Sequence, residues 1–219
     1  MNYFAHGIRF LDRPYFLAGT AVPDWLSAAD RKVRMRSRSV EPFADGSDSV
    51  TAELAAGVLQ HLDDDRWFHR TSVFFETTSR LAEMIRDVLG SEDGFRPGFL
   101  GHIAMELLLD GVLIDKYPKL LETYYSVLAE LDPQKIQDAV NRMARGTTSR
   151  LSLLIPRFQS EQFLRDYLDP KRLLLRLNQV MRRIKLKQLP DELETVLGNG
   201  WSLVHSRIDG LLPRTLFLS

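Results

Sequence analysis

Residues 61–69 read H-L-D-D-D-R-W-F-H, and residues 101–111 read G-H-I-A-M-E-L-L-L-D-G. In both stretches an imidazole or a carboxylate recurs at every fourth residue, namely His61, Asp65 and His69 in the first and His102, Glu106 and Asp110 in the second. On an α-helix a step of four residues turns a side chain by only about 40°, so each set is expected on one stripe of a helix. The second stretch is otherwise apolar, which predicts a helix that is buried nearly all round.

Ionisable side chains on a buried helical face need partners. Two helices that each offer imidazole and carboxylate groups suit a metal site inside a helical bundle. Taken alone, either pattern is also typical of a solvated helix surface or of a paired core histidine. Three of the five histidines fall into these two patterns, however, and the second pattern lies where exposure is least expected. Together the two patterns favour a metal centre.

Length and composition bound the kind of protein. The chain has 219 residues, enough for one well-buried core or two small ones. Its hydrophobic content of 44% and charged content of 26% are typical of a globular protein. With 29 basic and 29 acidic residues the net charge is zero, so no global field argues for nucleic acid as a partner.

The chain contains no cysteine, which excludes disulfides, thiolate metal sites and a cysteine nucleophile. A metal must therefore be held by nitrogen and oxygen ligands, which suit Mn, Fe, Zn or Mg. No run of residues approaches the roughly 20 apolar residues of a membrane span. The first residues also lack the basic start and apolar core of a signal peptide. We therefore expect a cytoplasmic protein without a membrane span.

Helical patterns follow one another along the chain, and no segment is typical of a β-strand. We expect helices over residues 2–11, 51–89 (with a break near 63–65 as an alternative), 97–114, 120–131, 133–145, a segment ending near 168, 171–187 and from 191 onward. The basic amphipathic segment 171–187 is expected to pack its leucines on the core, the alternative being a membrane surface. The prediction is a single all-α domain, a helical bundle over 1–219, with the metal site in 1–115 and a helical C-terminal part in 116–219.

Two further residues are candidate ligands. His6 lies among apolar neighbours, where a packed histidine is the alternative. Asp24 lies between Pro23 and Trp25, so it either caps a helix that begins there or brings a carboxylate to a buried site.

One basic cluster stands out, formed by Arg31, Lys32, Arg34, Arg36 and Arg38. It is either a solvated helix face or a docking patch for a phosphate group or an acidic protein partner.

These segments together resemble the acyl carrier protein phosphodiesterases, an all-helical family grouped with the HD-type metal-dependent phosphohydrolases. The family start, Met-Asn-aromatic-x-Ala-His, matches residues 1–6, and its Gly-Asn-Leu-Leu-Gly-Asp segment matches at Gly19 and Asp24. Its Gly-Ile-x-Leu-His-x-x-x-Asp motif matches, with a one-residue shift, at Gly57, Val58, Leu59, His61 and Asp65. Its later Asp-x-x-x-Asp-His helix matches Glu106 and Asp110.

The chain departs from this family at Leu62, His69 and Gly111, where the family has Arg, Asp and His, and His102 is an addition. His102 with Glu106 is also similar to the His-x-x-x-Asp helices of bacterial zinc-dependent phospholipases. The resemblance covers about the first half of the chain. It implies an HD-domain-like fold and metal-dependent hydrolysis of a phosphoric ester, with an acidic carrier protein as the substrate that docks at the basic cluster.

The expected metal ligands are His6, Asp24, His61, Asp65, His69, His102, Glu106 and Asp110, with Asp65 and Asp110 as catalytic residues. These are more ligands than one ion requires, so we expect two divalent ions, one activating a water and the other holding the phosphoryl oxygens. We further expect the two helical stripes to converge in one pocket, with His6 and Asp24 brought into it. The alternatives are a di-metal carboxylate oxidase or metal carrier, and a non-catalytic helical metal-binding or protein-interaction module with 31–38 and 171–187 as its contact surfaces.

Overall fold

The computed structural model describes residues 1–90 and 95–213, and these form helices joined by short connections, with no β-strand among them. The all-α prediction is therefore confirmed. The chain divides into two compact units made of non-contiguous segments. We call them the α2 unit, residues 3–67 and 117–162, and the α6 unit, residues 1–2, 68–116 and 163–219. The likeness to an HD domain and the boundaries of a single domain over 1–219 stay predictions.

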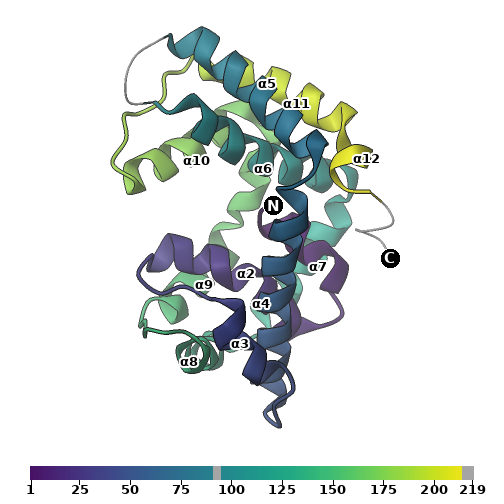
Figure 1. Cartoon of the computed structure of the whole chain (residues 1–219), viewed down its shortest axis with the longest axis vertical. Coiled ribbons are helices and arrows are strands. Elements are labelled where there is room, and N and C mark those ends of the chain that lie inside the picture. Colours follow the sequence, from purple (N-terminus) through teal and green to yellow (C-terminus); the bar gives the residue numbers. More distant parts are fainter. Residues whose placement is uncertain (91–94, 214–219) are drawn as a thin grey trace. The chain divides into compact units, whose positions relative to one another are not determined.

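The α2 unit is built from the helices of the N-terminal third and of the middle of the chain (Figure 1). Its elements are α1 (Tyr3–Gly7), the 3-10 helix η1 (Ile8–Phe10), α2 (Pro14–Ala29), α3 (Ser37–Ala44), α4 (Ser49–Phe68, whose last residue belongs to the other unit), α7 (Pro118–Ala129), α8 (Pro133–Met143) and α9 (Leu151–Glu161).

Helices α2 and α4 cross with their backbones in contact, because glycine stands on both sides of the crossing. A Cβ atom added at Gly57 would lie 2.1 Å from the Phe16 carbonyl oxygen and 2.9 Å from the Cα atom of Gly19. This close approach brings the carbonyl oxygen of Thr20 to within 2.8 Å of the His61 ring. Two small residues thus set the position of one candidate ligand.

Asp24 lies inside α2, because that helix continues through Pro23 to Ala29. No helix begins at Asp24, so the alternative that it caps one is wrong. A proline is tolerated here because only one backbone hydrogen bond of the helix is lost, while the buried α2 side chains, Trp25 and Leu26 among them, hold the helix on the core.

The α6 unit has α5, α6 and α11 packed against one another (Figure 1). Its elements are α5 (Ser72–Leu89), α6 (Pro97–Lys116), the 3-10 helix η2 (Phe163–Leu168), α10 (Pro170–Arg183), α11 (Leu193–Ser206) and α12 (Ile208–Leu211). As expected, α10 buries its apolar side, with Leu173, Leu174, Leu177 and Met181 in the core.

Helix α6 is the central element of its unit, and its residues 107–114 are all buried, as the apolar pattern predicts. Among the described residues it is the helix that is long and apolar enough to cross a membrane, and 67% of its most apolar window is buried inside the protein. A core helix of a soluble protein meets the same criterion, so the absence of a membrane span stays a prediction.

The predicted helix over residues 51–89 is interrupted, and this changes the first histidine pattern. Helix α4 ends at Phe68, and α5 begins at Ser72, where the Thr71 side chain accepts a hydrogen bond from the Phe74 amide. The expected helix through this region is wrong, and so is a break near residues 63–65. His69 therefore lies beyond the end of α4 and does not continue the stripe of His61 and Asp65.

Candidate metal centre

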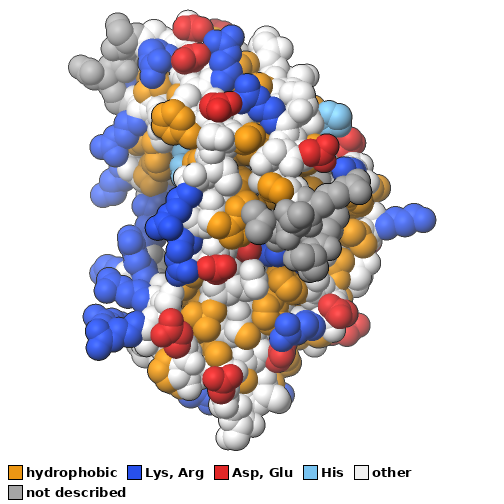
Figure 2. All heavy atoms as spheres, turned by 45° about the vertical axis from the view of Figure 1, so that its right-hand side comes forward, with side chains coloured by type: hydrophobic (Ala, Val, Ile, Leu, Met, Phe, Trp, Pro, Cys, Tyr) orange, Lys and Arg blue, Asp and Glu red, His pale blue; other side chains and the backbone are white. Residues whose placement is uncertain are grey.

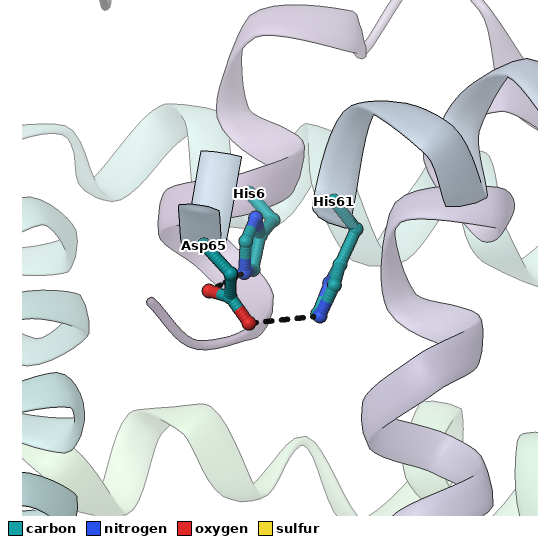
Figure 3. Close-up of side chains that lie close together, drawn as sticks. All are labelled: His6, His61 and Asp65. Carbon is teal, nitrogen blue, oxygen red and sulfur yellow. Dashed lines mark ion pairs between the residues drawn. The ribbon is translucent and has the colours of Figure 1, made fainter. Parts of the chain in front are cut away.

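Three of the expected ligands meet in the α2 unit. His61 and Asp65 lie one turn apart on α4, and His6 comes from α1, so that both rings lie beside the same carboxylate (Figure 3). The Nε2 atom of His6 is 3.3 Å from Asp65 Oδ1, and the Nε2 atom of His61 is 3.5 Å from Asp65 Oδ2. Both histidines are buried, while the Asp65 side chain is 32% exposed, so the group is open to solvent on the carboxylate side. We call it the α2-unit triad.

Each histidine of this triad is oriented through its other ring nitrogen. The Nδ1 atom of His61 is 2.8 Å from the Thr20 carbonyl oxygen, and that of His6 is 3.4 Å from Asp64 Oδ2. Both partners are acceptors, so each Nδ1 carries the proton and donates it outward. In the neutral rings this leaves the lone pairs on Nε2, directed at Asp65. An outer acceptor that fixes the tautomer in this way is the usual companion of a metal-bound histidine.

The Nε2 lone pairs of His6 and His61 and the Asp65 carboxylate would repel one another, and a cation between them would remove this repulsion. Two lone pairs and a carboxylate facing one another repel unless a proton or a metal ion lies between them. The imidazoles of His6 and His61 are stacked with centroids 3.8 Å apart and planes at 23°, and both Nε2 atoms face Asp65. One divalent ion shared by the three groups would accept both lone pairs and balance the charge of the carboxylate.

The spacing of the ligand atoms fits such an ion. Bonds of about 2.0–2.2 Å from a zinc-like ion place neighbouring ligand atoms roughly 3.0–3.5 Å apart, depending on the coordination angle. The separations of 3.3 and 3.5 Å in the triad lie in this range. The donor set, two imidazoles and one carboxylate, also suits Zn, Mn or Fe.

Asp65 is held in the ionised form that a metal ligand needs. Burial raises the pKa of its carboxyl group, but the contacts with His6 and His61 outweigh burial and hold the pKa far below its ordinary value. The carboxylate is therefore charged at neutral pH.

Asp64, which contacts His6, was not predicted as a site residue, because in the sequence it resembles part of a polar surface with Asp63. It is buried and accepts hydrogen bonds from the side chains of Arg9, Gln60 and Trp67 at 2.5, 2.9 and 3.3 Å, besides its contact with His6. Burial raises the pKa of Asp64, and the His6 hydrogen bond and the charge of Arg9 lower it further than burial raises it. Gln60, four residues before Asp64, and Trp67, three residues after it, lie on the same helix face as Asp64. Their spacing was the available sign in the sequence that Asp64 has hydrogen-bond partners.

A second triad forms in the α6 unit from His69, His102 and Glu106. Glu106 Oε1 is 2.9 Å from the Nε2 atom of His69 and 3.3 Å from that of His102, and the amino nitrogen of Met1 lies 3.0 Å from the same oxygen. Phe74 packs on both imidazoles, with centroids 4.8 Å from His69 and 5.2 Å from His102. We call this group the α6-unit triad.

The two triads differ in how firmly their parts are held. Burial raises the pKa of Glu106, but the positive charge of the Met1 amino group and hydrogen bonds from the two histidines hold it well below its ordinary value. Within residues 1–90 and 95–213, however, no hydrogen-bond acceptor lies at the Nδ1 atom of His69 or of His102. The side chains of these two histidines are 32% and 40% exposed. In the α6-unit triad the carboxylate is therefore ionised, as a metal ligand must be, but its histidine rings have fewer hydrogen bonds that fix their orientation than those of the α2-unit triad.

Two expected ligands lie outside both triads. Asp24 is partly buried within α2, and Asp110 is fully buried in α6. Eight residues of helix advance about 12 Å along the axis, so a ligand at His102 and one at Asp110 are too far apart for one ion. Each triad belongs to one unit, and the expected convergence of both stripes in a single pocket stays a prediction.

Comparisons with protein-family models, with curated proteins and with solved structures found no match to this chain. The resemblance to acyl carrier protein phosphodiesterases rests on the short motifs quoted above. A function for this chain is therefore inferred from the geometry of the two triads.

Proposed function

We propose that the protein is a divalent-metal-dependent hydrolase of phosphoric esters, with one ion held by each triad. The observation that carries this proposal is the orientation of the α2-unit triad. His6 and His61 donate their Nδ1 protons to outer acceptors, and their Nε2 atoms face an ionised, partly exposed carboxylate. Such a set has three protein ligands and leaves the remaining coordination positions to water and substrate, as catalytic metal sites do.

The protein's own residues divide the work in this proposal. His6, His61 and Asp65 hold the ion, and Asp64 fixes the ring of His6. When bound, a divalent ion lowers the pKa of its water towards neutrality and stabilises charge on the phosphoryl oxygens. The exposed side of Asp65 gives the substrate access to the ion.

A phosphoric ester is the proposed substrate because of the ligand chemistry and the family resemblance together. A ligand set of imidazole and carboxylate without thiolate suits Mn, Fe, Zn or Mg, which are the ions of phosphoester hydrolysis. The resemblance at residues 1–6 and at His61 and Asp65 points to the same chemistry.

An acidic protein is the proposed docking partner. Residues 30–36 connect α2 to α3, and in this segment Val33 and Met35 are buried while Lys32, Arg34 and Arg36 are exposed. The buried Val33 and Met35 anchor this segment, so the exposed cations beside them face outward. These three cations have no carboxylate partner in the described part of the chain. On the face shown in Figure 2, Lys and Arg side chains gather along the left edge while Asp and Glu are scattered.

The test is turnover of bis(p-nitrophenyl) phosphate by protein loaded with Mn²⁺ or Zn²⁺ and freed of excess metal. We expect metal-dependent hydrolysis that His61→Ala lowers strongly, because this variant lacks one ligand of the α2-unit triad. The matched control is His205→Ala, which removes an exposed histidine of α11 outside both triads and should leave turnover unchanged. Equal turnover by both variants would refute the proposal.

A second candidate function follows from the same ligand set. Two histidines and one carboxylate also hold iron(II) in oxygenases, where open positions bind oxygen. Oxygen uptake by the iron-loaded protein, measured beside phosphodiester turnover, separates the two functions. Uptake that exceeds that of His61→Ala, without hydrolysis, would favour the oxidase.

A further inference from the structure

A groove runs along α5 beside the α6-unit triad. It has a volume of about 440 Å³ and is lined by Phe74, Phe75, Thr78, Ser79, Ala82, Glu83, Arg86, Gly98 and His102, all in the α6 unit. His102 and Phe74 belong to the triad and its packing as well as to the groove. A volume of this size is typical of a small-molecule site. The groove therefore opens from the triad itself.

The groove is elongated, because its α5 residues recur over about three turns. From Phe75 to Arg86 the helix rises by roughly 16 Å. The triad lies at the Phe74 end, where the rings of Phe74 and His102 are packed edge to face at 5.2 Å. Arg86 lies at the opposite end. Three small residues, Ser79, Ala82 and Gly98, are among the residues that line it, and a Cβ atom added at Gly98 would meet nothing within 4 Å.

The chemistry of the lining is graded along this length. Phe75, beside the triad end, is 70% exposed, which is unusual for so large an apolar side chain. Further along, the Thr78 hydroxyl is buried without a hydrogen-bond partner among the described residues. At the far end Glu83 is paired with Arg80 at 3.0 Å, whereas Arg86 has no carboxylate partner in residues 1–90 and 95–213. From the triad end to the far end, the lining thus offers an exposed aromatic ring (Phe75), a hydroxyl without a hydrogen-bond partner (Thr78) and a cation without a carboxylate partner (Arg86) among the described residues.

We propose that this groove binds the non-reacting part of an elongated phosphoric ester, an aromatic or apolar segment that ends in a carboxylate or a second phosphate. In this proposal the α6-unit triad is a second hydrolytic centre. The phosphoryl group lies at its ion, the apolar segment lies along Phe75, and the terminal anion pairs with Arg86. This inference rests on the proposed function for the identity of the reacting group. It goes further by naming the substrate class and the residues that select it.

The test measures binding and does not require turnover. Zn²⁺-loaded protein is titrated calorimetrically with two inert phosphonates, biphenyl-4-phosphonate and its longer analogue 4′-(carboxymethyl)biphenyl-4-phosphonate. We expect the longer analogue to bind about tenfold more tightly, since it adds a charge-assisted hydrogen bond at Arg86. Arg86→Gln should remove this difference, and Arg86→Lys, which keeps the charge, should retain most of it.

Two further variants probe the groove itself. Gly98→Leu places a side chain in the open space and should weaken both phosphonates at least tenfold, whereas Gly98→Ala should bind them like the wild type. Thr78→Val removes a buried hydroxyl without changing the shape of the groove, so it is the matched control that should bind both phosphonates like the wild type. Equal binding of the two phosphonates by the wild type, or a preference that survives Arg86→Gln, would overturn the inference.

Failure of this inference is distinguishable from failure of the proposed hydrolase. Phosphoester turnover that Gly98→Leu and Arg86→Gln leave unchanged refutes the groove and keeps the hydrolase. Selective phosphonate binding without hydrolysis of any ester keeps the groove as a ligand site and refutes the hydrolase.

Discussion

Replacing Asp64 by Asn separates the outer support of the α2-unit triad from the triad itself. Arg9 and His6 both contact Oδ2 of Asp64, whereas Gln60 and Trp67 contact Oδ1. Asparagine has one side-chain oxygen and one NH₂ group. In either orientation the NH₂ group therefore faces two hydrogen-bond donors that Asp64 had accepted from. The substitution therefore removes one charge-assisted hydrogen bond and one ordinary hydrogen bond in a buried place.

The expected loss of stability follows from these contacts. A charge-assisted bond contributes about 1.5–3 kcal/mol and an ordinary one about 0.5–1.5 kcal/mol, so Asp64→Asn should cost about 2–4 kcal/mol. The Arg9 side chain is 14% exposed, which lets water compensate part of the lost charge. The matched control is Asp63→Asn, since Asp63 is exposed and, within residues 1–90 and 95–213, pairs only with exposed Arg66. That change should cost less than about 0.5 kcal/mol.

The assay combines urea unfolding in the presence of a chelator with metal titration against a chromophoric competitor. An outer hydrogen-bond partner of a metal-bound histidine typically contributes tenfold to hundredfold to metal affinity. Asp64→Asn should therefore weaken metal binding at the α2-unit triad by about that factor and leave the α6-unit triad unchanged. Asp63→Asn should weaken neither. If Asp64→Asn equals Asp63→Asn in both stability and metal affinity, the role given to Asp64 is wrong.

The same variant carries a pH dependence with a defined sign. The pKa of Asp64 is lower in the folded protein than its ordinary value of about 3.9. Its contribution to stability is therefore fully present above about pH 4 and is lost as the pH falls through the folded-state pKa. The stability difference between wild type and Asp64→Asn, measured without metal, should narrow below about pH 4.

Three further predictions concern other parts of the molecule. Gly57→Ala should lower the free energy of unfolding by about 3 kcal/mol, because the new Cβ atom meets backbone at 2.1 Å, while Gly98→Ala should raise it by about 0.5–1 kcal/mol in the same urea titration. His69→Ala should remove one bound ion of two in elemental analysis and leave the α2-unit triad loaded; a loss of both ions would refute independent sites. Arg34→Glu with Arg36→Glu should weaken docking of an acidic protein substrate without changing hydrolysis of a small phosphodiester, and equal loss of both would contradict a docking role.

The fold class could be predicted because the chain is patterned consistently. Apolar residues recur at helical spacing throughout, and proline stands at or near the start of α2, α6, α7, α8 and α10, where it favours a helix start. The break between α4 and α5 was not predicted. It depends on Thr71 as a cap, and a threonine among many polar residues gives only a weak signal.

The site could be predicted in part. Four-residue spacing correctly paired His61 with Asp65 and His102 with Glu106, because neighbours one turn apart share a helix face. It failed at the third members of the stripes, since eight residues advance too far along the axis for one ion. The crossing of α2 and α4 at Gly19 and Gly57, which aims Thr20 at His61, depends on tertiary contacts that no local pattern contains.

Elemental analysis of the purified protein after loading with Zn²⁺ and exhaustive dialysis tests the central claim most directly. We predict close to two ions per chain in the wild type. We predict one ion in a folded His61→Ala variant, one in a folded His102→Ala variant, and two in the His205→Ala control. A wild-type protein that retains no ion, or triad variants that retain as many as the wild type, would contradict two metal-binding triads.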